Sequence, residues 1–464
     1  MGILIKNGTL VTASEHYQAD LLIDGEEIKA IGRGFDERSH EVVEAGGRYI
    51  LPGGIDGHTH FGAPLMETKM QGFDSTVGAL VGGTTSVVNF VHQPKGLSLL
   101  DSVAKHREEE AEGRSVADYG LHAMVTDVQE SLFEELPALA RAGVPTIKAF
   151  MAYKGTPLYS DDGTIFRLLQ KAREVGMLVM VHAENGDVID VLQKQLLAEG
   201  KTAPSYHALS RPPAVEAEAT GRAALLARIA GAPIFIVHVS CAEALAVIQK
   251  AAREGIGIFG ESCPHYLCLS ADELSRPNFE GAKYVCSPPL REPSNQDHLW
   301  RALQEGWLQT VGSDYCGLTF SGQKELGRHD FTKIPNGVPG VQSRLAILYT
   351  CGVLKGRLSL ERMVDVFATA PARFYGMFPK KGAILPGSDA DLVIFDPDYT
   401  GRISIATSYE GVDYSLYEGF EQKGRPEKVF LRGRLVVSDG SFIGRKGQGR
   451  FIPRSPYGLA YSGL

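Results

Sequence analysis

Short hydrophobic runs separated by turn residues occur at both ends of the chain, a pattern typical of antiparallel strands. Three of these stretches contain a two-residue turn signal: residues 3–11 around Asn7-Gly8, 20–31 around Asp24-Gly25, and 428–437 around Arg432-Gly433. Asn-Gly and Asp-Gly favour tight hairpins because both residues tolerate positive φ angles. Since neither end alone has enough strands for a stable sheet, we expect the two ends to pair into one small β-sandwich domain.

Apolar strand-like runs alternate with helical patterns through the middle of the chain, which is typical of βα units around a parallel sheet. Eight such runs occupy residues 49–56, 86–91, 119–125, 146–153, 177–182, 233–239, 257–263 and 308–314. Eight parallel strands over roughly 250 or more residues are what a TIM-type (β/α)8 barrel requires. A doubly wound sheet produces a similar alternation, so periodicity alone leaves that alternative open. We predict an α/β fold, with a barrel over residues 51–384 and the sandwich domain over residues 1–50 and 385–464.

Composition and charge exclude several other classes of protein. The chain of 464 residues is longer than one hydrophobic core usually serves, which agrees with two domains. A net charge of -8 and a pI near 5.9 argue against a surface for nucleic acid or anionic membranes. No apolar run reaches the roughly 18 residues of a membrane span, and we recognise no secretory leader. The six cysteines are scattered without a Cys-x-x-Cys pair, so we expect reduced thiols in a cytoplasmic protein.

Potential metal ligands lie near the carboxyl ends of the predicted barrel strands, where TIM barrels place their active sites. The first strand ends in His58 and His60, and residues two apart in a strand point the same way, so both imidazoles can reach one ion. The fifth and sixth strands carry His182 and His238, and the eighth ends at Asp314. A single histidine in such a place is more often a hydrogen-bonded core residue. The joint placement instead favours a site for Zn²⁺ or a similar divalent ion.

Lys148 lies inside the fourth apolar run. A buried ammonium is costly, so an inward lysine needs a partner or must lose its charge. A neutral lysine amine can take up carbon dioxide and become a carbamate, an anionic ligand able to bridge two metal ions. A lysine directed at a carboxylate or at solvent is commoner in general, and that alternative stays open at this point.

Several segments resemble the dihydropyrimidinase and D-hydantoinase family of cyclic amidohydrolases. The resemblance covers nearly the whole chain and is carried by residues 52–60 (PGGIDGHTH), 148–153 (KAFMAY), 181–186 (VHAENG), 206–212 (YHALSRP), 286–291 (CSPPLR) and 334–340 (IPNGVPG). The segment at 206–212 is specific to this branch, whereas the His-x-His pattern is shared across the superfamily.

The resemblance implies a binuclear metal centre. The implied ligands are His58, His60 and Asp314 for one ion, His182 and His238 for the other, and a carboxylated Lys148 that bridges the two ions together with a hydroxide. The ions are expected to be zinc, with manganese or another divalent metal as an alternative. No other cofactor is implied.

Three further roles follow from the same resemblance. Tyr153 would donate a hydrogen bond to the developing oxyanion, and backbone groups at Ser287 and Asn336 would hold the ring amide of the substrate. Asp314 would carry a proton from the attacking hydroxide to the departing ring nitrogen. The implied reaction is the hydrolytic opening of 5,6-dihydropyrimidines or hydantoins to N-carbamoyl amino acids, performed by a homotetramer.

Two positions depart from the family pattern: Tyr315 stands where histidine is usual, and Asn89 where aspartate is more common. Neither position is a metal ligand in the pattern, so we expect altered tuning around the site and retained activity. Three other histidines, His92, His122 and His265, lie near predicted barrel strands. For these we expect structural roles or support of the ligands.

Two other functions stay open. A neighbouring cyclic amidase, such as an allantoinase or a dihydroorotase, would use a similar metal site, although dihydroorotase needs a cation for its substrate carboxylate. A non-catalytic dihydropyrimidinase-related scaffold would have lost metal ligands, whereas every ligand-type position is filled here. The sequence therefore favours a metal-dependent enzyme that opens cyclic amides.

Overall fold

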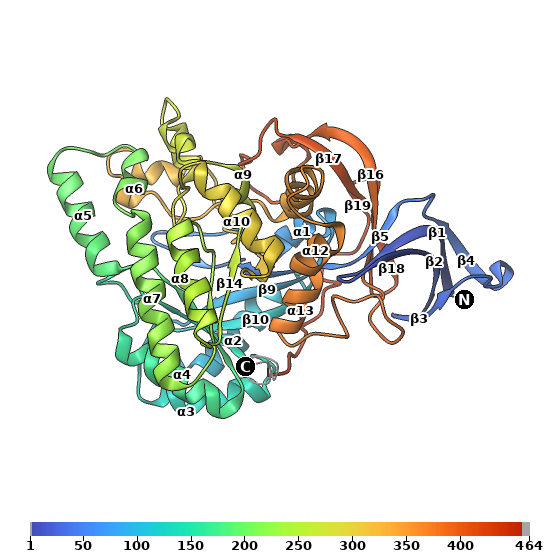
Figure 1. Cartoon of the computed structure of the whole chain (residues 1–464), viewed down its shortest axis with the longest axis horizontal. Helices are drawn as coiled ribbons and strands as arrows, with labels where there is room; N and C mark the ends of the chain where they lie inside the picture. Colours follow the sequence, from blue (N-terminus) through green and yellow to red (C-terminus); the bar gives the residue numbers. More distant parts are fainter. Residues whose placement is uncertain (1, 457–464) are drawn as a thin grey trace.

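The computed structural model describes residues 2–456 and contains a parallel barrel beside a sheet built from both ends of the chain (Figure 1). The barrel strands are β6 (Gly54–Thr59), β9 (Thr84–His92), β10 (Asp118–Met124), β11 (Thr146–Phe150), β12 (Leu178–His182), β13 (Ile234–Ile236), β14 (Ile258–Ser262) and β15 (Thr310–Val311). Each pairs in parallel with its neighbour in chain order. After β15, Tyr315 bridges to Thr59, and its carbonyl accepts a hydrogen bond from His60 N at 2.9 Å. This contact closes the ring, and the predicted barrel is confirmed.

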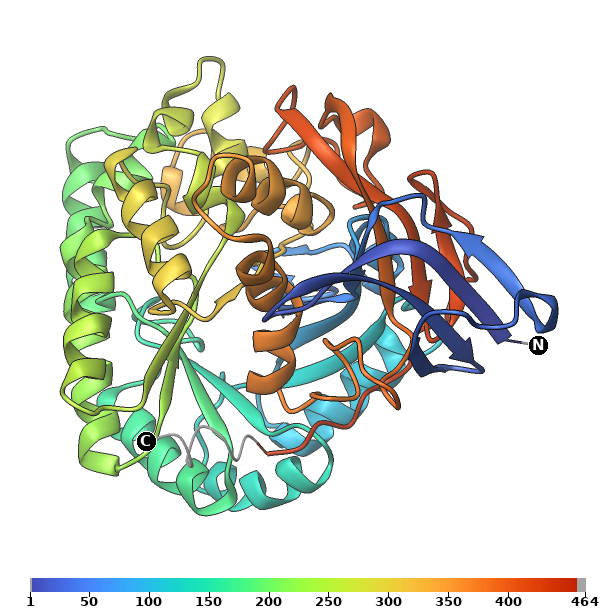
Figure 2. The ribbon, with the colours of Figure 1, turned by 45° about the vertical axis from the view of Figure 1, so that its right-hand side comes forward.

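Helices surround the barrel on its outside (Figure 2). They are α1 (Thr76–Val81), α2 (Leu99–His106), α3 (Ser131–Arg141), α4 (Asp162–Val175), α5 (Gly186–Ala198), α6 (Ser205–Leu209), α7 (Pro213–Ala230), α8 (Ala242–Arg253), α9 (Pro264–Cys268), α10 (Ser294–Glu305), α11 (Arg344–Ile347), α12 (Leu360–Val364) and α13 (Ala370–Phe374). In α4 the Asp161 side chain accepts a hydrogen bond from Thr164 N at 2.8 Å, which caps the first turn. Gly176 ends the helix with a φ of 71°, a conformation that suits glycine. Ile165 and Leu169, one turn apart, are buried on its inner face.

The two ends of the chain pair into one mixed sheet, as expected. Its strands are β1 (Gly2–Val11), β2 (His16–Asp24), β3 (Glu27–Gly32), β4 (His40–Glu44), β5 (Tyr49–Pro52), β16 (Leu392–Arg402), β17 (Glu421–Leu431), β18 (Arg434–Ser438) and β19 (Ser441–Phe442). β5 joins the two halves, because it pairs in parallel with β1 and antiparallel with β16. A separate apolar core, which includes Leu10, Ile23, Ile50, Leu392 and Phe430, packs within this part of the chain. A short hairpin, β7 (Pro64–Leu65) and β8 (Thr68–Lys69), lies outside both sheets.

One of the three predicted hairpin turns is wrong. Asn7-Gly8 does not reverse the chain, because β1 continues through it as a bulge, with Asn7 at a φ of 58°. The Asn7 side chain donates to Glu44 on β4, and its N–H donates to Asp20 on β2, so neighbouring strands hold the bulge in place. The other two turns are confirmed: β2 and β3 form a hairpin, and so do β17 and β18.

The first predicted apolar run, residues 49–56, is divided between the two sheets. Its first half is β5 in the terminal sheet, and its second half begins β6 in the barrel. The change occurs at Gly53, where a Cβ atom would lie 2.2 Å from Thr85 Oγ1. Only glycine fits this close approach, so the chain can pass from one sheet to the other there.

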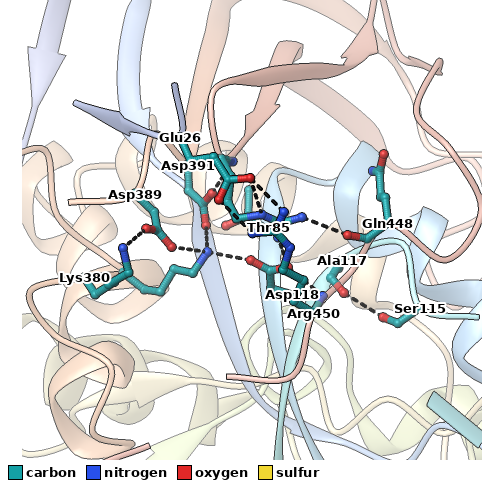
Figure 3. A network of polar contacts seen from close by, with 12 residues as sticks. Glu26, Thr85, Ser115, Ala117, Asp118, Lys380, Asp389, Asp391, Gln448 and Arg450 are labelled. Atoms are coloured by element: carbon teal, nitrogen blue, oxygen red, sulfur yellow. Dashed lines mark hydrogen bonds and ion pairs between the residues drawn. The ribbon is translucent and has the colours of Figure 1, made fainter. Parts of the chain in front are cut away.

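A buried ion-pair network joins the barrel to the terminal segments, and Figure 3 shows Asp118, Asp389 and Asp391 within it. The Lys381 Nζ atom lies 2.7, 2.8 and 2.7 Å from these three carboxylates, and Arg432 also pairs with Asp118. Because the Lys381 amine lies among the three carboxylates and offsets their charge, the cluster is an ion-pair network within the protein. Asp118 begins β10, so the network lies at the opposite end of the barrel from the predicted ligands. Within residues 2–456, no helix has the length and apolar character to cross a membrane.

Candidate metal centre and active site

The six predicted metal ligands meet at the carboxyl end of the barrel. They are His58 on β6, His60 just after it, Lys148 on β11, His182 at the end of β12, and His238 and Asp314 shortly after β13 and β15. Five separate strands therefore contribute to one cluster. Its geometry comes from the parallel order of the barrel, which places the ends of all strands at one rim.

Distances between the side chains are short enough for shared metal binding. Asp314 Oδ1 lies 3.0 Å from His58 Nε2 and 3.3 Å from His60 Nε2. The ring of His238 neighbours the rings of His58 and His182, with centroids 5.4 and 4.5 Å apart. Ligand atoms of His58, His238 and Asp314 all lie within 4.8 Å of one another. These residues offer neutral nitrogen and carboxylate oxygen donors, which suit zinc and similar ions.

Buried glutamates orient two of the histidines. Nδ1 of His58 contacts Oε1 of Glu261, and both side chains are fully buried. Nε2 of His182 lies 2.7 Å from Oε2 of Glu184. When one ring nitrogen of a histidine is hydrogen-bonded to a carboxylate, the other ring nitrogen is available to bind a metal. His58 therefore presents Nε2 and His182 presents Nδ1, and the buried Nδ1 of His238 has no hydrogen-bond partner in the described part of the chain.

Three residues at the site have left-handed backbone conformations. Tyr153, His238 and Asp314 have φ angles of 62°, 44° and 50°. Non-glycine residues adopt such angles at a cost of about 1–3 kcal/mol each, and they persist where surrounding packing holds them. All three follow barrel strands, where the turn directs a side chain toward the centre of the rim. Stored backbone strain of this kind is typical of functional sites.

The charge states of the cluster suit metal binding. Burial opposes the charge of Asp314, but the charge of His58 and hydrogen bonds from His58 and His60 hold the carboxyl pKa well below its ordinary value. Burial lowers the pKa of His60 to about 4 against the opposing effect of Asp314. Burial likewise keeps the pKa of His238 well below its ordinary value. At neutral pH these shifts favour the carboxylate form of Asp314 and the neutral imidazoles of His60 and His238, the forms that coordinate a metal.

Lys148 is buried at the centre of this cluster. Its Nζ atom lies 3.0 Å from His58 Nε2 and stands over the rings of Phe90 and Phe150, at 4.2 and 4.9 Å from their centroids. Burial lowers the pKa of Lys148 to about 8, although Asp314 and Glu261 act in the opposite direction. About a tenth of the amine is therefore uncharged at pH 7, far more than for an exposed lysine. Lys148 is buried, and within residues 2–456 no carboxylate lies within 4 Å of its amine, so neither alternative, a lysine directed at solvent or one in an ion pair, applies to the described chain.

A cavity of about 500 Å³ opens above the cluster. Tyr153, Ser287 and Asn336 all line it, together with an apolar wall and with every metal-ligand candidate except His58. Burial raises the pKa of the Tyr153 hydroxyl, partly offset by the Arg211 charge and by hydrogen bonds with Ser287 and Asn336. The hydroxyl is therefore protonated at neutral pH and available as a donor. The structure brings the three predicted substrate residues together on one wall.

Sequence reasoning missed the residues that support the ligands. Glu261 lies inside the seventh apolar run, and a carboxylate in such a run was the available signal. Arg211 belongs to the 206–212 segment and donates to Glu184 Oε2 at 2.6 Å, with its guanidinium 5.4 Å from the Tyr153 ring centroid. Only the tertiary structure reveals that Arg211 connects His182, through Glu184, with Tyr153.

Asn89 and Tyr315, the two departures from the family pattern, form hydrogen bonds with backbone groups of loop residues. The Asn89 side chain accepts from Phe61 N at 2.6 Å and donates to Phe61 O at 3.1 Å, which fixes the start of the loop after His60. The Tyr315 hydroxyl donates to Glu410 O at 2.8 Å. Asn89 therefore fixes the backbone next to the ligand His60, whereas the Tyr315 hydroxyl fixes the backbone at Glu410, and both leave the ligand set complete.

The remaining histidines have the expected supporting positions. His122 stacks against Phe90, its Nδ1 lies 2.5 Å from Thr146 Oγ1, and its Nε2 lies 3.0 Å from Gly57 O. His265 is buried beside Tyr266. His92 lines the cavity without belonging to a group of potential metal ligands in the described chain.

Comparison with known proteins identifies the family of the chain. Residues 49–436 match the amidohydrolase family. The chain is 50% identical to a D-hydantoinase from Geobacillus stearothermophilus, covering 98% of this chain and 97% of that one, and 48% identical to a D-hydantoinase from Ralstonia pickettii, covering 98% and 100%. The crystal structure of a dihydropyrimidinase from Brevibacillus agri superposes with a TM-score of 0.97 at 51% identity, covering 98% of this chain and 99% of that one. An L-hydantoinase (dihydropyrimidinase) from Arthrobacter aurescens reaches a TM-score of 0.89 at 31% identity, covering 97% and 99%. The chain therefore belongs to the amidohydrolase family, in the group that contains the D-hydantoinases and dihydropyrimidinases.

Proposed function

We propose that this protein hydrolyses cyclic amides, opening 5,6-dihydropyrimidines or hydantoins to N-carbamoyl amino acids. The observation that carries the proposal is the complete cluster of ligand-type side chains around Asp314 at the base of a substrate-sized cavity. The near 50% identity to D-hydantoinases over almost the whole chain supports the same reaction. A scaffold without catalytic activity has no need of this cluster.

The site fits two divalent metal ions, of which zinc suits the donor set best. We assign the ligands as the resemblance implied: His58, His60 and Asp314 for one ion, and His182 and His238 for the other. The unpartnered nitrogen of His238 and the carboxylate shared by two imidazoles support this assignment. When bound, such ions make hydroxide available at neutral pH and polarise the amide carbonyl.

Lys148 fits the bridging position as a carbamate. Its amine is buried, has a pKa near 8 and lies within reach of His58. Attack of the neutral amine on carbon dioxide forms a C–N bond and releases one proton, which leaves an anionic group with two oxygens. That group would neutralise part of the metal charge, whereas an ammonium beside two cations would be repelled.

Four other residues provide the remaining steps, Ser287 and Asn336 through their backbone groups and Tyr153 and Asp314 through their side chains. Ser287 and Asn336 hold the ring amide against the wall of the cavity, and Tyr153 donates its hydroxyl proton in a hydrogen bond to the carbonyl oxygen as negative charge develops there. The Asp314 carboxylate takes the proton from the attacking hydroxide and delivers it to the ring nitrogen as the C–N bond breaks. The ring opens to one product, an N-carbamoyl amino acid, which has a carboxylate where the amide carbonyl was and an NH2 group at the former ring nitrogen.

The cavity favours a neutral substrate over an anionic one. The lysines and arginines that line it in the described chain are Lys148, Lys154 and Arg211. Lys154 pairs with Asp187 at 3.0 Å, and Arg211 pairs with Glu184. Since both of these cations already have carboxylate partners, neither is free for the substrate carboxylate that a dihydroorotase must bind.

We further propose a cytoplasmic homotetramer. Apolar side chains exposed on the outer helices α5, α6 and α7, namely Val188, Val191, Leu209, Leu225 and Ile229, support a contact between subunits. The six cysteines are all free in the structure, which supports a reducing compartment. Light scattering of the purified protein measures the number of subunits directly.

The test of the reaction is the ring-opening rate of the purified, zinc-supplemented protein. The substrates are 5,6-dihydrouracil, unsubstituted hydantoin and a 5-substituted hydantoin, with allantoin and dihydroorotate as comparison rings. We expect turnover of the first group, and the rate ratio within it separates a pyrimidine-degrading enzyme from a hydantoinase. Turnover of only allantoin or dihydroorotate would refute the substrate class, and no turnover of any ring would refute the proposed function.

A further inference from the structure

Lys324 is a buried lysine that the proposed reaction does not use. It begins a short 3-10 turn, η6 (Lys324–Gly327), and its side chain has 0% exposure. Its Nζ atom donates to Val285 O and to Pro335 O, both at 2.7 Å. Within residues 2–456 no carboxylate lies within ion-pair distance of its amine, whose hydrogen-bond partners are these two carbonyls.

The two carbonyls belong to the segments that carry the proposed ring-binding residues. Val285 lies two positions before Ser287, and Pro335 lies directly before Asn336. The Gly337 N–H donates to the same Val285 carbonyl at 3.1 Å, so the segments touch at one backbone hydrogen bond. The Lys324 side chain adds a second connection between them.

The backbone of Lys324 is fixed by contacts of its own, as its amine is. Its backbone N–H donates to Thr319 O at 3.1 Å. At Gly327, the end of the same turn, a Cβ atom would lie 2.1 Å from Ile334 Cγ1, so the turn packs directly against the segment that leads to Asn336. A fixed backbone and two short hydrogen bonds leave the side chain a single position.

The residue type is costly at this place. Burial lowers the pKa of Lys324 to about 7, against the opposing effect of the Cys286 and Cys316 thiols. A buried amine without an acidic partner is destabilising relative to an apolar side chain of the same length. Both the neutral and the charged amine have the two N–H bonds that the carbonyls need. An apolar side chain would fill the same space without N–H bonds. The lysine differs because its N–H bonds can hold the two carbonyls together.

We propose that Lys324 is a positioning residue for substrate binding, which clamps the Val285 and Pro335 carbonyls so that Ser287 and Asn336 face the cavity together with Tyr153. This inference rests on the proposed function, because it assigns the ring amide to Ser287 and Asn336. It predicts that Lys324 affects how tightly the ring is held, and that it affects metal binding little.

The test is steady-state kinetics of Lys324→Met with the 5-substituted hydantoin or 5,6-dihydrouracil that the wild type opens. We expect KM to rise about tenfold with kcat changed less than about threefold, which is the signature of lost uniform binding. Metal content should remain that of the wild type. Lys324→Gln, whose amide keeps two N–H bonds on a shorter chain, should give an intermediate KM and provides a second variant if the methionine variant does not fold.

Two matched lysines separate positioning from general stability. Lys381→Met removes an equally buried lysine at the opposite end of the barrel, and it should lower the Tm with KM unchanged. Lys333→Met removes an exposed lysine close in the chain and should change neither quantity.

Three outcomes would overturn the inference. An unchanged KM in Lys324→Met would do so, and so would a parallel loss of Tm, kcat and metal content like that of a purely structural variant. Absence of any turnover by the wild type would overturn the proposed function, and this inference with it. An active wild type beside an unaffected variant would overturn the inference alone.

Discussion

Glu261→Gln tests whether a buried carboxylate tunes the metal ligand His58. The substitution keeps the size of the side chain and an oxygen that can accept from Nδ1, but it removes the negative charge. Burial and Lys148 lower the pKa of His58, whereas Asp314 and Glu261 raise it, and overall the pKa is raised. Carboxylate partners of ligating histidines typically contribute 10–100-fold in metal affinity. We therefore expect a loss of about 1.4–2.8 kcal/mol in metal-binding free energy.

The assay is competition between the metal-free protein and a chromophoric zinc chelator, at fixed pH and salt. Glu410→Gln is a matched control, because Glu410 is also buried but accepts hydrogen bonds from Gly340 N and Gln342 N, away from the ligands. The control should keep the wild-type zinc affinity. Equal zinc affinity in Glu261→Gln and the wild type would refute the reasoning, as would an equal loss in both variants.

Three further predictions concern the ligands and the cavity. Lys148→Ala should lose bound metal and most activity, and partial recovery with added acetate would support the carbamate, whereas undiminished activity would contradict it. Tyr153→Phe should keep the metal content but lose about 10²–10³-fold in kcat, as other oxyanion donors do; a loss below about threefold would rule out that role. The metal-free protein should lose stability as the pH falls from about 6.5 toward 4, because the buried imidazoles of His60 and His265 have pKa values of about 4 and that of His207 about 3. As the pH falls, the histidines of the unfolded chain take up protons at a higher pH than the buried histidines of the folded protein do, which favours unfolding. Urea unfolding at several pH values measures this effect. A free energy of unfolding that stays constant over this pH range would contradict it.

Periodicity in the sequence predicted the strands of the barrel and their order, but it left a doubly wound sheet open as an alternative. Eight apolar runs predicted eight barrel strands, and the turn signals at Asp24-Gly25 and Arg432-Gly433 predicted true hairpins. The same signal failed at Asn7-Gly8, because a positive φ serves a bulge as well as a turn. A bulge forms where the residues on both sides of the signal pair with other strands as one continuous strand, and a turn forms where the residues on the two sides pair with each other. Here the partners are β2, which is the next strand along the chain, and β4, which follows β3.

The sequence by itself also determined the identity of the candidate ligands. Strand ends are a local property, and the parallel order of a barrel brings them to one rim, so His58, His182, His238 and Asp314 could be named in advance. Their orientation depends on residues from other strands and helices, such as Glu261, and no local pattern reports such pairs. The cavity wall and the Lys324 clamp likewise arise where loops from separate βα units meet. Only the tertiary structure decided these features, because hydrogen bonds between distant segments have no periodic signature in the sequence.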